Sequence, residues 1–179
     1  MLSRIISLVL IFLVSPILII VALFILFSDG FPIIFKQRRI GKNSHEFIIY
    51  KFRTMKNNVG DIPTHLLKNS KSKYIKFGQT LRKYSFDELP QLFNIIFGDL
   101  AFIGPRPALY NQKDLIELRE KLNVNKLKPG ITGWSQINGR DSLSIKEKVD
   151  LDVYYLKNKS LSLDLLILIK TFIQLIFPK

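Results

Sequence analysis

RIISLVLIFLVSPILIIVALFILFSD (residues 4–29) decides the class of this 179-residue chain. Residues 5–28 are all neutral and mostly Ile, Leu, Val and Phe. As a straight α-helix they would be about 36 Å long, enough to cross a hydrocarbon core of roughly 30 Å. A cleaved signal peptide fits less well, because its apolar region is usually about 7–15 residues long and a small-residue cleavage site follows it. The stretch therefore predicts an N-terminus held in a membrane.

Ser15-Pro16 interrupts this helix near its middle. Proline has no N–H, so the carbonyl of Phe12 loses its helical donor. In lipid that carbonyl needs another partner, and the Ser15 hydroxyl is a candidate. Two geometries stay open: a kinked helix that spans the membrane, and a re-entrant helix that returns to the face it entered. The residues alone favour the spanning helix.

Flanking charge predicts on which side the rest of the chain lies. Arg4 alone precedes the apolar run, whereas Lys36, Arg38 and Arg39 follow it. Because positive residues favour the cytoplasmic side, the main body is expected in the cytoplasm in either geometry.

Composition narrows the classes of partner and site. The chain has 27 Lys and Arg against 14 Asp and Glu, a formal charge of +13, which predicts nucleic acid, an anionic membrane face or a phosphorylated substrate as partner. It has no Cys, which excludes disulfides and thiolate metal sites. His45 and His65 are its two histidines, too few to favour an imidazole metal site.

Between residues 32 and 55 the sequence predicts a β-hairpin. PIIFKQRRIG (32–41) and HEFIIYKFRTM (45–55) are rich in β-branched and aromatic residues, with the turn at GKNS (41–44). The hairpin carries a set of basic residues that either form a solvated face or bind phosphate: Lys36, Arg38, Arg39, Lys51 and Arg53.

The remaining chain predicts short helices and loops. Helical or turn-rich patterns follow an irregular loop (56–76) in this order: helix 80–84, helix 90–98, helix 108–128, turns 128–141, helix 144–158 with a Ser144–Glu147 capping box, and apolar helix 160–179. The last helix is short for a span, so it either packs in the core or lies at the membrane interface. The expected fold class is α/β, α-rich with a small hairpin and without a large sheet.

YSFDELPQL (84–92) places two acids side by side in this basic chain. Ser85 and Glu88 have the spacing of a capping box, and Asp87 would lie in the first helical turn, where the helix dipole favours an anion. Taken as an isolated motif, the pair is best explained by this capping role.

The same pair suits catalysis. A carboxylate in a first turn near cations is expected to stay ionised, because both lower its pKa, and an ionised carboxylate can attack phosphorus. Arginines or a divalent cation must then offset the charge of the substrate. Arg82 and Arg106, the latter fixed between prolines in GPRP (104–107), are close in sequence, and Mg²⁺ suits a chain without Cys ligands. Glu88 could handle protons.

Four quoted segments together resemble a known family. They are Ser15-Pro16 in the apolar run, KFRTM (51–55), LRKYSFDELPQLFNIIFGDLAFIGPRP (81–107) and KPGITGWSQINGRD (128–141). The set resembles the bacterial sugar transferases, and within them the small monotopic phosphoglycosyl transferases. The resemblance covers almost the whole chain.

The resemblance implies an activity. Such enzymes move a sugar 1-phosphate from a UDP-sugar to undecaprenyl phosphate and release UMP, a first membrane step of glycoconjugate biosynthesis. Asp87 would be the nucleophile of a ping-pong reaction with a covalent phosphosugar intermediate. Mg²⁺ would lie near Asp87, and Glu88 would be an acid-base group or a metal ligand. Substrate contacts would come from Lys51, Arg53, Arg82, Pro105, Arg106, Pro107 and Arg140.

The resemblance also implies a topology. The Ser15-Pro16 break becomes the turn of a re-entrant helix, which reverses the preference drawn from the residues alone. Residues 1–30 would be the membrane-inserted helix, and 31–179 a catalytic domain on the cytoplasmic face of the bacterial inner membrane, with interfacial amphipathic helices. Membrane lipid would be a partner and nucleic acid would not, while the sugar and the formation of a homodimer stay open.

Two other classes compete with this interpretation. A basic membrane-anchored binding protein would gain nothing from carboxylates beside fixed arginines, so Asp87→Asn would leave its binding intact. A multi-span polyprenyl-phosphate transferase would need more apolar segments than the two that the chain offers.

Overall fold

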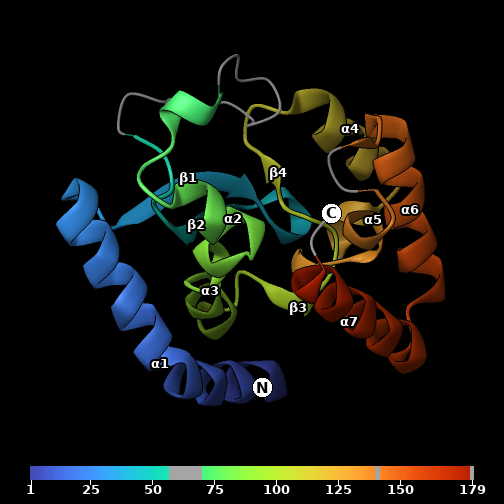
Figure 1. Cartoon of the computed structure of the whole chain (residues 1–179). Coiled ribbons are helices and arrows are strands. Elements are labelled where there is room, and N and C mark those ends of the chain that lie inside the picture. Colours follow the sequence, from blue (N-terminus) through green and yellow to red (C-terminus); the bar gives the residue numbers. More distant parts are fainter. Residues whose placement is uncertain (57–69, 140–141, 178–179) are drawn as a thin grey trace.

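The computed structural model of the chain describes residues 1–56, 70–139 and 142–177 (Figure 1). It is a mixed α/β structure rich in helix, as predicted. In chain order its elements are α1 (Leu2–Asp29), β1 (Ile34–Ile40), η1 (Lys42–Ser44), β2 (Glu46–Phe52), η3 (Ser70–Lys73), α2 (Gly78–Lys83), η4 (Phe86–Glu88), α3 (Gln91–Phe97), β3 (Ala101–Ile103), β4 (Ala108–Leu109), α4 (Lys113–Lys121), η5 (Val124–Lys126), β5 (Gly130–Thr132), α5 (Trp134–Ile137), α6 (Ile145–Asn158) and α7 (Leu161–Ile176).

Helix α1 is bent into two arms, which Figure 1 shows at the lower left. Pro16 lies inside this helix, and proline is a usual cause of a sharp kink. The Ser15 Oγ donates a hydrogen bond to the Phe12 carbonyl at 2.8 Å. The predicted replacement for the donor that Pro16 removes is therefore confirmed.

The first arm of α1 is fastened to α3 by polar contacts. Ser7 is fully buried, and its Oγ donates to the Leu92 carbonyl at 2.8 Å. Arg4 Nη2 donates to the Phe97 carbonyl at 3.4 Å, where α3 ends and its carbonyls lack helical donors. The beginning of α1 thus lies against the body of the protein.

The second arm of α1 packs on the body as well. Val21 and Ile25 are buried in a cluster that includes Phe52 of β2. Arg53 closes this end: its guanidinium contacts the Asp29 carboxylate at 2.7 Å and donates to the carbonyls of Asp29 and Gly30 at 3.0 and 2.7 Å. Both arms are therefore held by the same body.

Most of the remaining side chains of α1 are apolar and exposed. In the part of the chain that the structure describes, α1 is the one helix that is long and apolar enough to cross a membrane. This criterion concerns length and composition alone.

The predicted hairpin is confirmed. Strand β1 pairs antiparallel with β2, from Ile34 opposite Phe52 to Ile40 opposite Glu46, and the short β4 pairs with the other edge of β1. Strands β3 and β5 form a separate parallel pair. In Figure 1 the β1–β2 hairpin lies behind α2.

Helix 144–158 begins as predicted, because Ser144 and Glu147 form a complete capping box at the start of α6. The single helix expected over 108–128 is wrong. Ala108 and Leu109 instead form β4 and are buried beside β1. After α4, Asn123 adopts a left-handed backbone with φ 61°, which ends the helix before η5.

Helix α7 takes one of the two roles that its sequence left open, packing in the core, and the predicted place at the membrane interface stays a prediction. Ile167 is fully buried against Ile137 and Tyr155, so one face of α7 packs in the core. The other faces expose large apolar side chains along the whole helix, among them Leu161, Leu165, Leu168, Ile169, Phe172 and Ile176. A soluble surface rarely carries so many in one helix.

Candidate active site

Asp87 and Glu88 lie in η4, the short helical turn between α2 and α3. Ser85 before them has a left-handed backbone, φ 56°, and its side chain makes no capping hydrogen bond. The capping-box interpretation of Ser85 and Glu88 is therefore wrong. A capping residue needs an extended backbone, and here the chain turns too tightly after α2 to provide one.

Glu88 is joined to two cations from distant parts of the chain. Its Oε1 lies 2.7 Å from Lys51 Nζ on β2 and 3.2 Å from Arg106 Nη2 in the loop after β3. Burial alone would raise the pKa of Glu88, but Lys51 and Arg106 outweigh it and hold that pKa well below its usual range. Glu88 is thus ionised at neutral pH.

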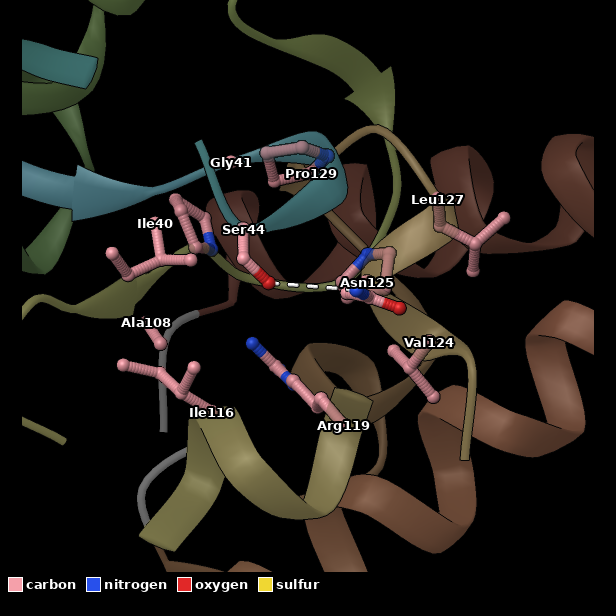
Figure 2. Close-up of a pocket in the computed structure, with 12 residues that line it drawn as sticks. Ile40, Gly41, Ser44, Ala108, Ile116, Arg119, Val124, Asn125, Leu127 and Pro129 are labelled. Atoms are coloured by element: carbon pink, nitrogen blue, oxygen red, sulfur yellow. Dashed lines mark hydrogen bonds between the residues drawn. The ribbon is translucent and has the colours of Figure 1, made fainter. Parts of the chain in front are cut away.

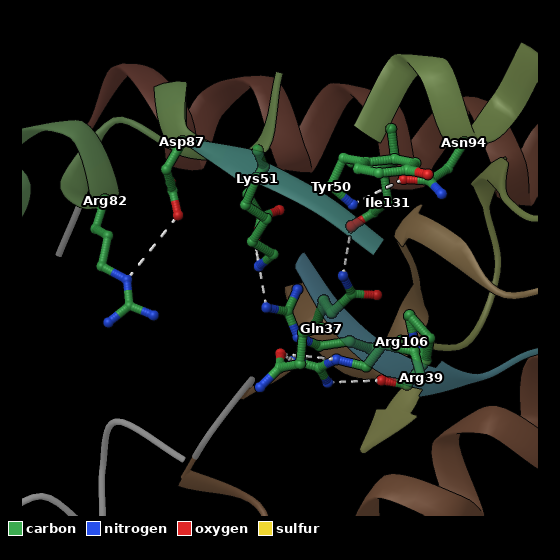
Figure 3. Close-up of polar contacts among 12 residues, drawn as sticks. Gln37, Arg39, Tyr50, Lys51, Arg82, Asp87, Asn94, Arg106 and Ile131 are labelled. Atoms are coloured by element: carbon green, nitrogen blue, oxygen red, sulfur yellow. Dashed lines mark hydrogen bonds and ion pairs between the residues drawn. The ribbon is translucent and has the colours of Figure 1, made fainter. Parts of the chain in front are cut away.

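Asp87 is more weakly paired than its neighbour. It is 4% exposed, and its Oδ2 lies 3.9 Å from Arg82 Nε, the contact drawn in Figure 3. Burial and the adjacent Glu88 charge raise the pKa of Asp87 to about 6, against the opposing effect of Lys51, Arg82 and Arg106. The expectation that cations and the helix dipole lower this pKa is wrong in direction, because it left out burial.

The three cations at this site, Lys51, Arg82 and Arg106, differ in solvent exposure. Lys51 is buried, and burial lowers its pKa although Glu88 opposes that shift. The side chains of Arg82 and Arg106 are 32% and 37% exposed. Figure 3 shows the Lys51 and Arg106 side chains pointing toward one another, with Arg82 apart from them and facing Asp87. Asp87 is thus buried and Glu88 largely covered, while the two arginines that contact them are partly exposed, so an anion from solvent can reach these arginines.

The structure separates one predicted contact from this cluster. Arg53 lies at the end of α1, against Asp29. Pro105 and Pro107 flank Arg106 and so lie beside the site, whereas Arg140 lies outside the described residues.

Sequence reasoning missed Tyr74. Arg82 Nη1 donates to the Tyr74 hydroxyl at 3.4 Å, and the Arg82 guanidinium lies 5.8 Å from the centre of the Tyr74 ring. Tyr74 belongs to the segment predicted as an irregular loop, where no periodic pattern marked it. The bridge between Met55 and Tyr74 brings it next to the end of β2.

Comparison with known proteins gives this cluster a context. Residues 1–178 match the family described as Bacterial sugar transferase. The chain belongs to that family. It is 45% identical over 142 residues to an uncharacterized sugar transferase, EpsL, of Bacillus subtilis, a match that covers 79% of this chain and 69% of the relative.

Larger relatives carry more specific names. The chain is 35% identical to the UDP-N-acetylgalactosamine-undecaprenyl-phosphate N-acetylgalactosaminephosphotransferase of Aeromonas hydrophila, over 88% of this chain and 38% of the relative. It is 33% identical to the UDP-glucose:undecaprenyl-phosphate glucose-1-phosphate transferase of Xanthomonas campestris pv. campestris, over 92% of this chain and 36% of the relative. It therefore matches about a third of each of these longer proteins.

The sugar transferase offers few protein ligands for a metal ion. Within residues 1–56, 70–139 and 142–177, no three His, Cys, Asp or Glu side chains gather into a metal site. Asp87 supplies a carboxylate that does not share the short contacts of Glu88. One carboxylate completed by substrate phosphate oxygens is a common arrangement for Mg²⁺, so the residues fit an ion that is bound together with substrate.

Proposed function

We propose that the chain transfers a sugar 1-phosphate from a UDP-sugar to undecaprenyl phosphate, with release of UMP. The observation that carries this proposal is a pair of adjacent carboxylates, Asp87 buried and Glu88 largely covered, in contact with two partly exposed arginines, in a family whose longer members are named for such transfers. Accessible cations suit the diphosphate of a nucleotide sugar and the phosphate of a polyprenol alike.

In the first half of the proposed reaction, an Asp87 carboxylate oxygen attacks the β-phosphorus of the UDP-sugar. An O–P bond forms to Asp87, the bridging P–O bond breaks, and UMP leaves with the bonding electron pair. With a pKa of about 6, Asp87 is mostly ionised at pH 7 and so is available as a nucleophile.

In the second half, a phosphate oxygen of undecaprenyl phosphate attacks the same phosphorus. Its new O–P bond replaces the bond to Asp87, whose carboxylate leaves with the electron pair. The product is undecaprenyl-diphosphate-sugar, and the enzyme returns to its first state. Each substrate reacts with a different form of the enzyme, which predicts ping-pong kinetics.

Arg82 and Arg106 are proposed to offset the negative charge that accumulates at the phosphorus. Glu88 holds Lys51 and Arg106 in place through its short contacts. Because its pKa is held low, Glu88 has no proton to donate at neutral pH, which favours this orienting role over acid catalysis. Mg²⁺, held by Asp87 and substrate phosphates, would add Lewis-acid stabilisation of the transferred phosphoryl group.

The membrane arrangement proposed for residues 1–30 is a re-entrant helix. Arg4 and Ser7 at its start and Arg53 at its end tie both arms to one body, which forms the catalytic domain of residues 31–179. With both ends on one side, the flanking charges favour the cytoplasmic face of the inner membrane. The apolar faces of α1 and α7 would enter the lipid, so that polyprenyl phosphate reaches the site without leaving the membrane.

The reaction is tested by incubating purified protein in detergent with undecaprenyl phosphate, Mg²⁺ and a panel of UDP-sugars. UMP release is expected with wild type, and Asp87→Asn is expected to lose more than about a thousandfold in turnover. Chelation of Mg²⁺ should also stop release. Intact-protein mass spectrometry with UDP-sugar alone should show a sugar-phosphate adduct on wild type and none on Asp87→Asn. Release of UDP instead of UMP would refute the proposed chemistry.

Topology is tested with single cysteines, because the chain has none of its own. Ser3→Cys and Lys146→Cys place thiols at exposed positions in the first turn of α1 and on the body. In oriented membrane vesicles, a re-entrant α1 predicts that an impermeant maleimide labels both from the same side. Labelling from opposite sides would establish a spanning helix.

A further inference from the structure

The segment Gly104–Pro107 brings Arg106 to Glu88. Its backbone is anchored at the start by the Gly104 N–H, which donates to the Thr132 carbonyl at 2.9 Å, and beyond that through its carbonyl oxygens. Pro105 and Pro107 have no N–H with which to anchor it. The Pro105 carbonyl accepts from the Gly130 N–H at 3.0 Å, and the Pro107 carbonyl accepts from Arg39 Nη1 at 2.9 Å. The carbonyl of Arg106 itself accepts from Nη1 of Arg119 at 2.8 Å.

Arg119 is held from behind by a buried carboxylate. Its Nε and Nη2 donate to Asp152 Oδ2 at 3.1 and 2.6 Å, which joins α4 to α6. Ser135 of α5 donates to the other oxygen, Asp152 Oδ1, at 2.9 Å. Asp152 is 1% exposed. One guanidinium therefore spans from an interior carboxylate to the backbone of the active-site loop.

The geometry of Arg119 exceeds what an interior ion pair requires. A lysine could neutralise Asp152, but only a planar fork can donate two hydrogen bonds to the carboxylate and a third, in fixed direction, to a carbonyl. The third bond ends on the residue whose side chain meets Glu88. The contact thus links the core to the site by an unbroken chain of hydrogen bonds.

Arg119 also lines a cavity of about 30 Å³ whose lining includes neither Asp87 nor Glu88 (Figure 2). Pro105, Pro107 and Ser44 line it as well. This volume holds a water molecule or two and no sugar, so Arg119 does not meet substrate there.

We propose that Arg119, fixed by Asp152, is a positioning residue for phosphosugar transfer: it locks the carbonyl of Arg106 so that the Arg106 guanidinium stays between Glu88 and the anionic substrate. This inference rests on the proposed function. Arg119 acts through Arg106 and touches neither substrate.

The first readout does not depend on substrate. Hydrogen–deuterium exchange of the peptide over residues 104–107 reports the amides of Gly104 and Arg106, because both prolines lack one. Arg119→Lys is expected to speed this exchange by at least about tenfold, since the carbonyl anchor is lost, with the β1–β2 hairpin unchanged. Unchanged exchange in 104–107 overturns the proposal, whether or not any UDP-sugar is turned over.

The second readout is a double-mutant cycle on kcat/KM for UMP release. Misplacement of Arg106 in Arg119→Lys is expected to lower kcat/KM by roughly 10- to 100-fold. If Arg119 acts through Arg106, adding Arg119→Lys to Arg106→Ala should cost no more than about a further twofold. Effects that multiply would mean that Arg119 supports the fold independently of Arg106, and would overturn the proposal.

Two further variants control for folding. Val149→Ala removes buried packing on the same α6 helix without touching the Arg119 contacts, so it should lower Tm and leave kcat/KM within about twofold of wild type. If Arg119→Lys does not fold, Ser135→Ala replaces it, because it removes one hydrogen bond to Asp152. A smaller change in the same direction in both readouts is then expected, and none would overturn the proposal.

Discussion

Two clusters in this molecule join an arginine to a buried carboxylate, and they differ in what remains open. In the interior cluster, Arg119 and Asp152 are 10% and 1% exposed in their side chains, and both carboxylate oxygens accept hydrogen bonds. In the site cluster, Glu88 is covered while Arg106 is 37% exposed. The closed cluster can only hold other groups in place, whereas the open one presents a cation to an anion from outside.

The clusters also differ in the ratio of cations to carboxylates. Asp152 has Arg119 as its close partner, and burial still raises its pKa. Glu88 draws both Lys51 and Arg106, and its pKa falls. Asp87 is left with Arg82 at 3.9 Å, and its pKa rises to about 6. Glu88 thus has the closer cations and can orient them, whereas Asp87 has the weaker pairing and can react.

Breaking the interior cluster should have the largest effect on stability. Asp152→Ala leaves the Arg119 charge buried and unpaired, so the free energy of unfolding is expected to fall by about 3–5 kcal/mol. Urea unfolding in mild detergent measures this, followed by the fluorescence of Trp134, the one tryptophan of the chain. A loss below about 1 kcal/mol would show that the interior cluster is not a closed structural pair.

Breaking the site cluster should lower the free energy of unfolding by less than breaking the interior cluster. Glu88→Gln keeps the shape of the side chain, and the exposed Arg106 can turn to water. Lys51, whose pKa burial already lowers, can release its proton. We expect a loss of about 2–3 kcal/mol at pH 7, and a smaller loss at higher pH, because burial favours the neutral form of Lys51. The same urea-unfolding assay tests this prediction. If Glu88→Gln lowered the free energy of unfolding as much as Asp152→Ala does, both at pH 7 and at higher pH, the distinction between the clusters would be lost.

Local sequence predicted the part of the site cluster whose residues lie near each other in the chain. Arg82 and Asp87 are five residues apart, and their closeness in sequence was enough to expect the contact, although a left-handed turn at Ser85 separates α2 from η4. The Ser15 hydrogen bond to Phe12 followed from the chemistry of proline in a helix in the same way. Such contacts are set by the backbone of a short segment, which sequence patterns describe well.

Contacts between distant segments were beyond sequence reasoning from the residues alone. Glu88 meets Lys51 because β2 lies beside η4, and nothing within either segment specifies that neighbour. The Arg119–Asp152 pair gave no signal at all, because mixed charge on two helices is typical of solvated surfaces. The pKa of Asp87 was misjudged for the same reason, since burial depends on the packing of the whole fold.

The pH dependence of stability isolates Asp87. Its pKa is about 6 in the folded protein against a usual value of 3.8, so the folded state binds more protons and stability falls as pH rises from about 4 to 6. The expected loss is about 1–3 kcal/mol. Glu88, with its lowered pKa, acts oppositely: its contribution is lost as pH falls below about 4.5. Asp87→Asn should flatten the unfolding free energy between pH 4 and 6, and a persisting slope would assign it to another group.

An exposed pair completes the comparison and should show the smallest effect. Arg38 lies 3.8 Å from Glu46, with both side chains about half exposed, and its guanidinium lies 4.0 Å from the centre of the Tyr110 ring. Water and salt screen such contacts, so Arg38→Ala should change the free energy of unfolding by less than about 1 kcal/mol, and less still in 0.5 M salt. The distance alone would rank this pair beside that of Arg82 and Asp87. If Arg38→Ala lowered the free energy of unfolding as much as Glu88→Gln, burial of the charges would not explain the difference between the clusters. The division between a closed structural pair and an open reactive one would then lose its physical basis.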